Sequence, residues 1–179
     1  MLFRSLTAIV DPLEILDKHF LDSVAILPEV KFAKKLLDIG SGAGLPGLPL
    51  KIMLPELSVV MVESVAKKVG FVKQAIASLN LKDAACIQKR AEGAPAEEGL
   101  PLADCVVSRA FCELSTWVPL AARYLLQGGR VVAMLAQPPP GSVVRSVEAH
   151  AGMRKVSERS YHLPLSGDPR CVLTFERST

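Results

Sequence analysis

A short strand, a glycine-rich turn and the start of a helix follow one another within residues 36–47, LLDIGSGAGLPG. Glycines at Gly40, Gly42 and Gly44 allow the backbone to turn sharply with positive φ angles and leave bare main chain beside a ligand. The N–H groups at the start of the following helix then face that ligand. The run therefore predicts a strand–turn–helix unit that cradles a nucleotide-like cofactor.

Strand and helix patterns alternate along the rest of the chain. We expect strands over residues 35–39, 58–62, 84–88, 104–108 and 130–135, and helices over about 47–54, 65–79, 114–126 and 142–151. A turn rich in proline joins two further strands, 155–163 and 170–176. This order indicates an α/β fold with a mostly parallel seven-stranded sheet, an antiparallel C-terminal hairpin and helices on both faces.

Helix ends are predicted from a few residues that stop or start helices. Residues 11–14, DPLE, form a capping box with proline at the first helical position, and an apolar stripe continues this helix to Pro28. The pair Gly128-Gly129 is expected to end the helix over residues 114–126. Residues 92–102, rich in Gly, Pro and Glu, are interpreted as a loop.

Composition indicates one globular domain over residues 1–179, in which residues 1–30 form a helical segment. Half of the residues are hydrophobic and 22% are charged. No apolar run approaches the roughly 18 residues that span a membrane, and the first residues make a poor signal peptide, so we expect a cytoplasmic protein. The net charge of +3 is weak evidence for a nucleic-acid partner. The four cysteines lack CxxC spacing, which favours buried free thiols over a metal site: Cys86, Cys105, Cys112 and Cys171.

Two cofactor classes fit the glycine turn. Residues 42–47 match the dinucleotide fingerprint, and Glu63 lies where a ribose-binding acid belongs, so an NAD-dependent reductase is one alternative. Asp38, however, suits a cofactor with an ammonium group and would repel a nearby pyrophosphate. With the C-terminal hairpin, the chain resembles class I S-adenosylmethionine-dependent (Rossmann-like) methyltransferases.

That resemblance gives roles to the residues after the strands. The glycine turn would carry the methionine part of S-adenosylmethionine, with Gly40 closest and Asp38 and Gly42 contributing. Glu63 would accept hydrogen bonds from the ribose hydroxyls; the alternative is a solvated acid at a strand end. Ala91 and Glu92 would flank the adenine.

Longer strings resemble one family, RsmG (GidB), whose members methylate N7 of a guanine in bacterial 16S (small-subunit) ribosomal RNA. The strings are SLTAI at 5–9, KHFLDS at 18–23, LDIGSGAGLPGLP at 37–49, RAE at 90–92 and VSRAF at 107–111. The resemblance implies that Gly40, Leu45, Ala91, Glu92 and Arg109 bind the methyl donor. It also shows departures: the helical segment 1–30 is shortened relative to the family, and Ala136 stands where the family often has lysine.

The implied reaction requires no general base, because guanine N7 carries a free lone pair at neutral pH. Arg109 is a candidate for substrate positioning as well as for donor binding, and its alternative is a surface ion pair with Glu92. His19, Asp22 and Ser23 lie on the N-terminal helix and can pack beside the cofactor pocket.

The expected partner is 16S rRNA or the small-subunit particle. We expect no association with a membrane, and we expect the protein to be a monomer. The alternatives are a methyltransferase of another substrate, the NAD-dependent reductase and a non-catalytic cofactor-binding protein.

Overall fold

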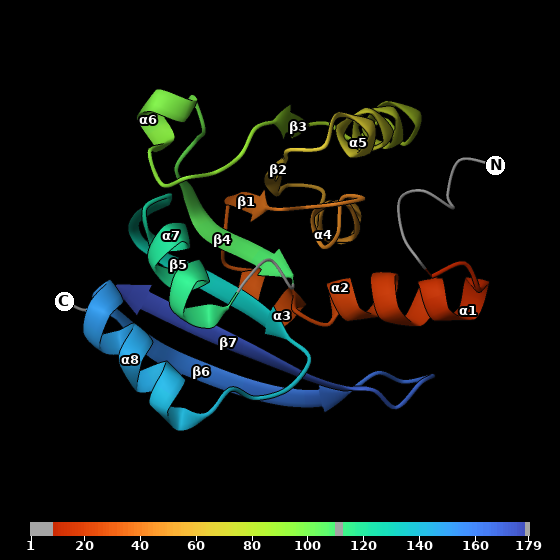
Figure 1. Ribbon diagram of the computed structural model, residues 1–179. Coiled ribbons are helices and arrows are strands. Elements are labelled where there is room, and N and C mark those ends of the chain that lie inside the picture. Colours follow the sequence, from red (N-terminus) through yellow and green to blue (C-terminus); the bar gives the residue numbers. More distant parts are fainter. Residues whose placement is uncertain (1–8, 110–112, 178–179) are drawn as a thin grey trace.

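The computed structural model describes residues 9–109 and 113–177 and contains one seven-stranded sheet (Figure 1). Its strands are β1 Lys35–Ile39, β2 Ser58–Glu63, β3 Ala84–Gln88, β4 Ala103–Arg109, β5 Leu125–Leu135, β6 Met153–His162 and β7 Pro169–Arg177. They lie in the order β3-β2-β1-β4-β5-β7-β6. The first five strands are parallel, and β7 is antiparallel to both β5 and β6. The predicted fold class is confirmed.

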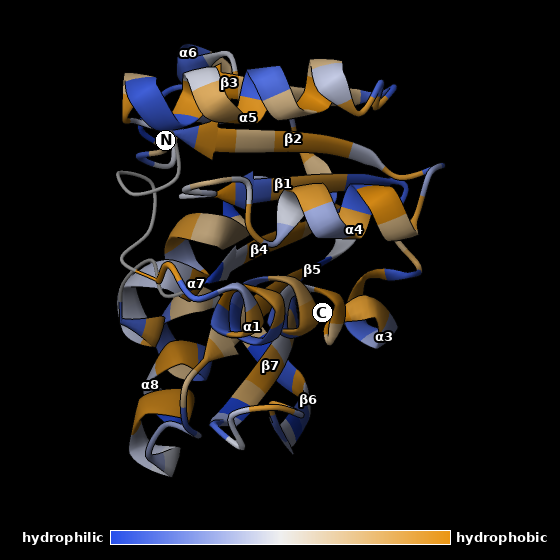
Figure 2. Cartoon of the chain, turned by 90° about the vertical axis from the view of Figure 1, so that its right-hand side faces the viewer, coloured by the Kyte–Doolittle hydropathy of each residue, from blue (hydrophilic) through white to orange (hydrophobic). Residues whose placement is uncertain are grey.

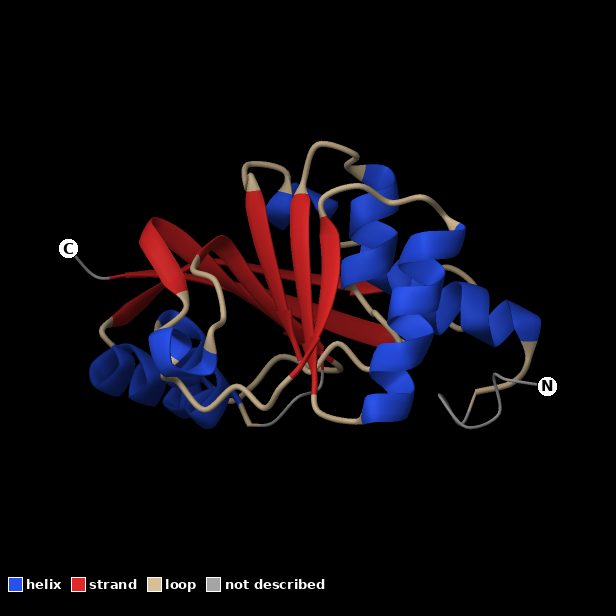
Figure 3. Ribbon diagram, turned by 90° about the horizontal axis from the view of Figure 1, so that it is seen from above, coloured by secondary structure: helices blue, strands red, loops and turns tan. Residues whose placement is uncertain are grey.

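Helices cover both faces of the sheet, as the views along and above it show (Figures 1 and 3). On one face lie α4 Gly47–Met53, α5 Ala66–Ser78 and the N-terminal segments α1 Pro12–Ile15, η2 Leu16–Leu21 (a π-helix), α2 Asp22–Val24 and α3 Leu27–Val30. On the other lie α7 Leu114–Ala122 and α8 Gly141–Ala151, with the short α6 Pro95–Glu98 on the same side.

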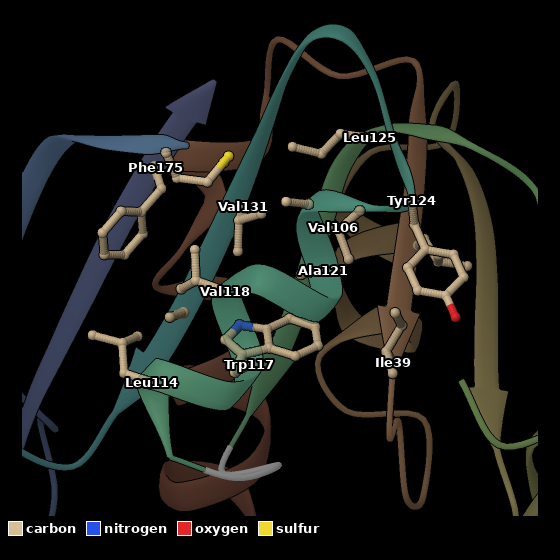
Figure 4. Close-up of a cluster of buried hydrophobic side chains, with 14 of the residues drawn as sticks. Ile39, Val106, Leu114, Trp117, Val118, Ala121, Tyr124, Leu125, Val131 and Phe175 are labelled. Atoms are coloured by element: carbon tan, nitrogen blue, oxygen red, sulfur yellow. The ribbon is translucent and has the colours of Figure 1, made fainter. Parts of the chain in front are cut away.

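A hydrophobic core fills each space between sheet and helices. The core under α7 and α8 includes Trp117, Val118 and Phe175 (Figure 4), and the core under α4 and α5 includes Leu50, Met61 and other buried residues. Burial of each such side chain stabilises the fold by about 1.5–3 kcal/mol. Strand β2, which lies between β3 and β1, is hydrophobic for most of its length, whereas α5 alternates between hydrophobic and hydrophilic positions (Figure 2). Strands covered on both faces show this near-continuous apolar pattern.

The N-terminal segment starts as predicted but continues differently. The Asp11 carboxylate accepts hydrogen bonds from the N–H groups of Leu13 (2.9 Å) and Glu14 (3.0 Å). The expectation that Pro28 ends the helix is wrong, because Pro28 lies in the first turn of a new helix, α3. Proline is tolerated there since a first-turn N–H has no partner within the helix.

Buried Asp17 joins the N-terminal segment to the loop between β6 and β7. Its carboxylate accepts hydrogen bonds from the N–H groups of Leu165 (3.1 Å) and Ser166 (2.9 Å). In Figure 1 this loop runs beside the N-terminal helices. A contact between the two ends of the domain therefore fixes this segment against the sheet.

Two further stretches of the chain differ clearly from the sequence-based expectation. Helix α7 ends at Ala122, and Gly128 lies inside β5 with φ +75°, so the pair Gly128-Gly129 does not end the helix. Leu125 pairs with Ala103 of β4 and is buried, which draws this stretch into the sheet. The loop predicted over residues 92–102 contains the short helix α6.

Candidate active site

The glycine turn after β1 is held by main-chain hydrogen bonds to β2. The N–H groups of Gly40 (2.8 Å) and Ser41 (3.1 Å) both donate to the carbonyl of Val62. Gly40, Gly42 and Gly44 have φ angles of +73°, +59° and +85°. Residues other than glycine adopt such backbone angles only at a cost in conformational free energy. The predicted turn is therefore built from main chain and anchored to the neighbouring strand.

Glu63, at the end of β2, holds the turn from the side. One carboxylate oxygen accepts from the N–H of Gly42 (3.0 Å) and the other from the N–H of Val65 (2.8 Å). The residue is 6% exposed, so it is not the solvated acid of the alternative interpretation. A carboxylate offers about four acceptor positions, so Glu63 can also accept hydrogen bonds from ligand hydroxyls.

Asp38 is completely buried and faces the start of α4. Its Oδ2 accepts a hydrogen bond from the Gly47 N–H at 2.9 Å, and its Oδ1 has no hydrogen-bond partner among the described residues. A Cβ at Gly47 would come within 2.9 Å of that same Oδ2 and 2.7 Å of the Met61 Cγ. Burial raises the pKa of Asp38 to about 7, an effect that the Gly47 hydrogen bond and the charge of Arg109 reduce.

A cavity of about 690 Å³ lies at the carboxyl ends of the first four strands. Five of the predicted site residues line it: Gly40, Glu63, Ala91, Glu92 and Arg109. Asp38 and Gly42 lie behind this lining, where they hold the turn. Leu45 lines a separate apolar pocket of about 470 Å³ between η2, α4 and α5. The structure thus brings five of the eight candidates to one cavity.

The cavity wall around Ala91 and Glu92 is supported by a network that the sequence did not reveal. The Tyr124 hydroxyl accepts from the Gly93 N–H (2.8 Å) and donates to Glu98 (2.5 Å). The Glu98 carboxylate accepts from the N–H groups of Glu92 and Ala94, both at 2.9 Å. Figure 4 shows the Tyr124 ring beside Ile39, with its hydroxyl directed away from the apolar cluster. These bonds fix the backbone that follows β3.

Arg109, at the end of β4, contacts the N-terminal helix. Its Nη1 donates to the carbonyl of Lys18 (2.6 Å) and lies 3.5 Å from Oδ2 of Asp22, while Nη2 lies 3.5 Å from Nδ1 of His19. The ion pair considered with Glu92 is replaced by the one with Asp22. Glu92 instead lies 4.0 Å from exposed Arg90.

A second pocket of about 360 Å³ shares Arg109 with the first cavity and also includes Lys18, Asp22 and Arg170. Asp22 was predicted only as a packing residue, and Arg170 was not among the predicted site residues. The available signal was weak: Arg170 opens the final strand directly after a predicted hairpin turn. Ala110 and Phe111 of the motif VSRAF lie outside the described residues, as do Cys112 and the first four residues of SLTAI.

Comparisons with known proteins give the family. The model of the family GidB, rRNA small subunit methyltransferase G, matches residues 3–162. The chain belongs to the GidB family. It is 50% identical over 173 residues to "Ribosomal RNA small subunit methyltransferase G" of Myxococcus xanthus (strain DK1622), and 46% identical to the protein of the same name in Anaeromyxobacter dehalogenans (strain 2CP-C). Each alignment covers 97% of this chain and 80% of the relative.

Solved structures share the fold of this GidB chain. A SAM dependent methyltransferase from Aquifex aeolicus superposes with a TM-score of 0.66 at 18% identity, over 96% of this chain and 97% of that one. A precorrin-6y C5,15-methyltransferase from Geobacter metallireducens superposes with a TM-score of 0.62 at 14% identity, over 87% of each chain. At these identities the likeness concerns the fold alone.

The helices and the potential metal ligands of this GidB chain bear on two further kinds of site. Within residues 9–109 and 113–177, every helix is too short or too polar to reach across a membrane. No group of three or more His, Cys, Asp or Glu side chains in those ranges is arranged to hold a metal ion. Cys86, Cys105 and Cys171 are buried free thiols, as expected from their spacing.

Proposed function

We propose that this GidB protein transfers a methyl group from S-adenosylmethionine to N7 of a guanine in 16S ribosomal RNA. The observation that carries the proposal is the cavity at the carboxyl ends of β1 to β4, which gathers Gly40, Glu63, Ala91, Glu92 and Arg109. Ligands of open α/β sheets bind at this edge. The family match covers most of the chain and supports ribosomal RNA as the acceptor.

The residues present fit the proposed methyl donor. The turn at Gly40 leaves main chain without side chains beside the cavity, and Glu63 has acceptor capacity for ribose hydroxyls. Ala91 is small and buried beside the position proposed for adenine. The Oδ1 of Asp38, which has no hydrogen-bond partner within residues 9–109 and 113–177, gives the turn a buried acidic group, which matches a cationic ligand better than an anionic one. We propose Leu45 as a further contact through its place in the same turn.

The chemistry asks the protein for positioning rather than for proton transfer. When bound, S-adenosylmethionine supplies a methyl group on a positively charged sulfur, which the free lone pair of guanine N7 can accept without prior loss of a proton. His19 is the histidine nearest to the shared wall at Arg109, and burial and then the Arg109 charge lower its pKa. A neutral imidazole there is compatible with a site that holds and orients its ligands. Holding two reactants in the correct geometry lowers a barrier by about 7–11 kcal/mol in favourable cases.

Four further proposals concern the partner, the location, the assembly and the domain organisation. We propose 16S rRNA or the small-subunit particle as the partner, the cytoplasm as the location and a monomer built as a single domain over residues 1–179. Positively charged side chains near the cavity, among them Lys89 and Arg90, can contact phosphates.

The test is methyl transfer from labelled donor to small-subunit rRNA that lacks the modification. Label on N7 of a guanine supports the proposal, whereas label only on protein or small molecules overturns it. Thermal shift with S-adenosylhomocysteine and with NADH separates the two cofactor classes. Stabilisation by NADH alone would exclude the methyl donor.

A further inference from the structure

Buried Asp22 connects four parts of the chain at the second pocket. Its Oδ2 lies 3.5 Å from Nη1 of Arg109 and 3.4 Å from Nε of Arg170, and its Oδ1 accepts a hydrogen bond from the hydroxyl of Tyr161 at 2.8 Å. The Asp22 side chain is 4% exposed, and those of Arg109 and Arg170 are 22% and 18% exposed. One carboxylate thus holds guanidinium groups from β4 and β7 on the N-terminal helix.

The surroundings make this carboxylate necessary for the arrangement. Lys18, Arg109 and Arg170 border the pocket, and Asp22 is the one carboxylate among its described lining residues. Lys18 pairs outside this lining with Glu14 (2.9 Å) and Asp168 (3.6 Å), which leaves the two arginines as the cations that Asp22 balances. Two guanidinium groups repel each other, and an anion between them offsets that repulsion. Removing one partner of a buried pair also leaves uncompensated charge, which costs more than the pair itself contributes. Without Asp22, the described lining of the pocket holds no counter-charge for this repulsion, and we expect the two guanidinium groups to move apart.

The other contacts limit how the arginines can move. Arg109 keeps a 2.6 Å hydrogen bond to the carbonyl of Lys18, whereas Arg170 donates to the neighbouring carbonyl of Pro169 at 2.8 Å and lies 3.9 Å from Asp168, which is 41% exposed. Asp22 is therefore the main restraint on Arg170 and a secondary restraint on Arg109. Tyr161 fixes the other oxygen of the carboxylate, so that Oδ2 stays directed at both guanidinium groups.

We propose that Asp22 is a positioning residue for methyl transfer: it holds Arg109 and Arg170 so that both face the pocket of about 360 Å³ that receives the target guanine. The proposal rests on the proposed function. The pocket adjoins the donor cavity through Arg109, which lines both. Guanine presents the acceptor O6 beside N7, and arginine is the side chain that most often contacts this edge. Guanidinium groups that donate to O6 leave the lone pair of N7 free for the methyl group.

The first experiment compares Asp22→Asn with wild type in steady-state methylation of small-subunit particles. Asparagine keeps the size and the acceptor for Tyr161 but removes the charge. We expect kcat to fall about 100-fold, because a displacement of about 1 Å in the groups around a reaction costs this much. The KM for the particles and the affinity for S-adenosylhomocysteine should stay close to wild type, because Arg109 keeps its bond to Lys18.

Glu29→Gln provides the matched control. Glu29 also joins the N-terminal segment to the terminal hairpin, through an ion pair with Arg159 of β6 at 2.7 Å, but it does not line the pocket. A purely structural role of Asp22 predicts parallel losses in both variants. Wild-type kcat in Asp22→Asn, or an equal loss in Glu29→Gln at matched melting temperature, overturns the proposal.

A double variant tests whether Asp22 acts through Arg170. If it does, Asp22→Asn combined with Arg170→Gln should lower kcat no further than the more damaging single variant, because groups that act as a unit are not additive. Multiplied losses would contradict the proposal. If Asp22→Asn does not fold, Tyr161→Phe replaces it, and unchanged kcat in that variant with intact structure would also contradict it.

Arginine side-chain NMR distinguishes failure of this proposal from failure of the proposed function. The Nε–H signal of Arg170 should be protected from exchange with water in wild type and in Glu29→Gln, and unprotected in Asp22→Asn. If wild type methylates no RNA, the proposed function fails and the assignment of the pocket fails with it. Active wild type with an unprotected Arg170 signal overturns the positioning role alone.

Discussion

The glycine turn and the second pocket lie on either side of Arg109, but main chain forms the turn and side chains form the pocket. The turn consists of main chain, held by nearby groups such as the Val62 carbonyl and the Glu63 carboxylate. The pocket consists of charged side chains from distant parts of the chain, with Asp22 and Tyr161 separated by 139 positions. The difference shows that a local motif can specify the first kind of site, whereas the second exists only in the folded domain.

A side chain in the turn should have the largest effect on the donor side. Gly40→Asp places a carboxylate at φ +73° beside the cavity. We expect affinity for S-adenosylhomocysteine to fall at least about 100-fold, roughly 3 kcal/mol, measured by calorimetry. The left-handed conformation costs about 1–2 kcal/mol, so the variant should still fold.

Gly70→Asp is the control for that substitution. Gly70 lies on the exposed face of α5, and a Cβ there meets nothing within 4 Å. The Gly70→Asp variant should bind S-adenosylhomocysteine as tightly as wild type does. Equal affinities in all three proteins would show that the donor does not approach the main chain at Gly40.

Tyr124→Phe should weaken the wall behind Ala91 and Glu92. The change removes the partner of the buried Gly93 N–H and one bond to Glu98. Leaving such a group unsatisfied costs about 1–3 kcal/mol, which urea unfolding measures, and donor affinity should fall a few-fold. A variant that loses stability but keeps full affinity would separate this network from the cavity.

Glu63→Gln keeps the shape of the side chain but changes its hydrogen bonding. An amide has one acceptor oxygen, so either the Gly42 N–H or the Val65 N–H then faces an NH₂ group. We expect about a tenfold loss of S-adenosylhomocysteine affinity, roughly 1.4 kcal/mol. Glu97→Gln, at an exposed position on α6, should have no such effect.

Asp38→Asn should produce the smallest change, visible in the pH dependence of stability. The pKa of Asp38 is raised to about 7 in the folded protein. The stabilisation that this carboxyl adds to the free energy of unfolding is therefore fully present below its pKa in the unfolded chain, and it is lost as pH rises through 7. Between pH 6 and pH 8, wild type should lose about 1 kcal/mol of unfolding free energy at this group. Chemical denaturation should show a flatter profile for Asp38→Asn, and parallel profiles would place the titration elsewhere.

Much of the fold was predictable because local patterns and tertiary packing agree. Strands β1 and β3 begin and end at the predicted residues: β1 stops directly before Gly40, and β3 begins directly after Asp83, both of which have positive φ angles. The prediction failed at Gly128, where pairing of Leu125 with Ala103 in the sheet outweighs the local preference of two glycines to end a helix. It also failed at Pro28, which can start a helix as well as stop one.

The candidate site also contains residues that could be predicted from the sequence and residues that could not. Gly40 and Glu63 were predicted from spacing and from the positions of strand ends, and both line the cavity. Arg170 and Tyr124 could not be predicted, because their roles depend on partners contributed by other elements. No periodicity or motif in one sequence indicates that a tyrosine after α7 supports a loop after β3.

The shared wall at Arg109 has a thermodynamic consequence. One guanidinium group borders both cavities, so a ligand that shifts it in one cavity changes the fit of a ligand in the other. Such coupling is reciprocal: each ligand alters the affinity of the other by the same factor. Order of addition then matters to the rates of the enzyme but not to the combined free energy of binding, and a single arginine sets how strongly the two binding events depend on each other.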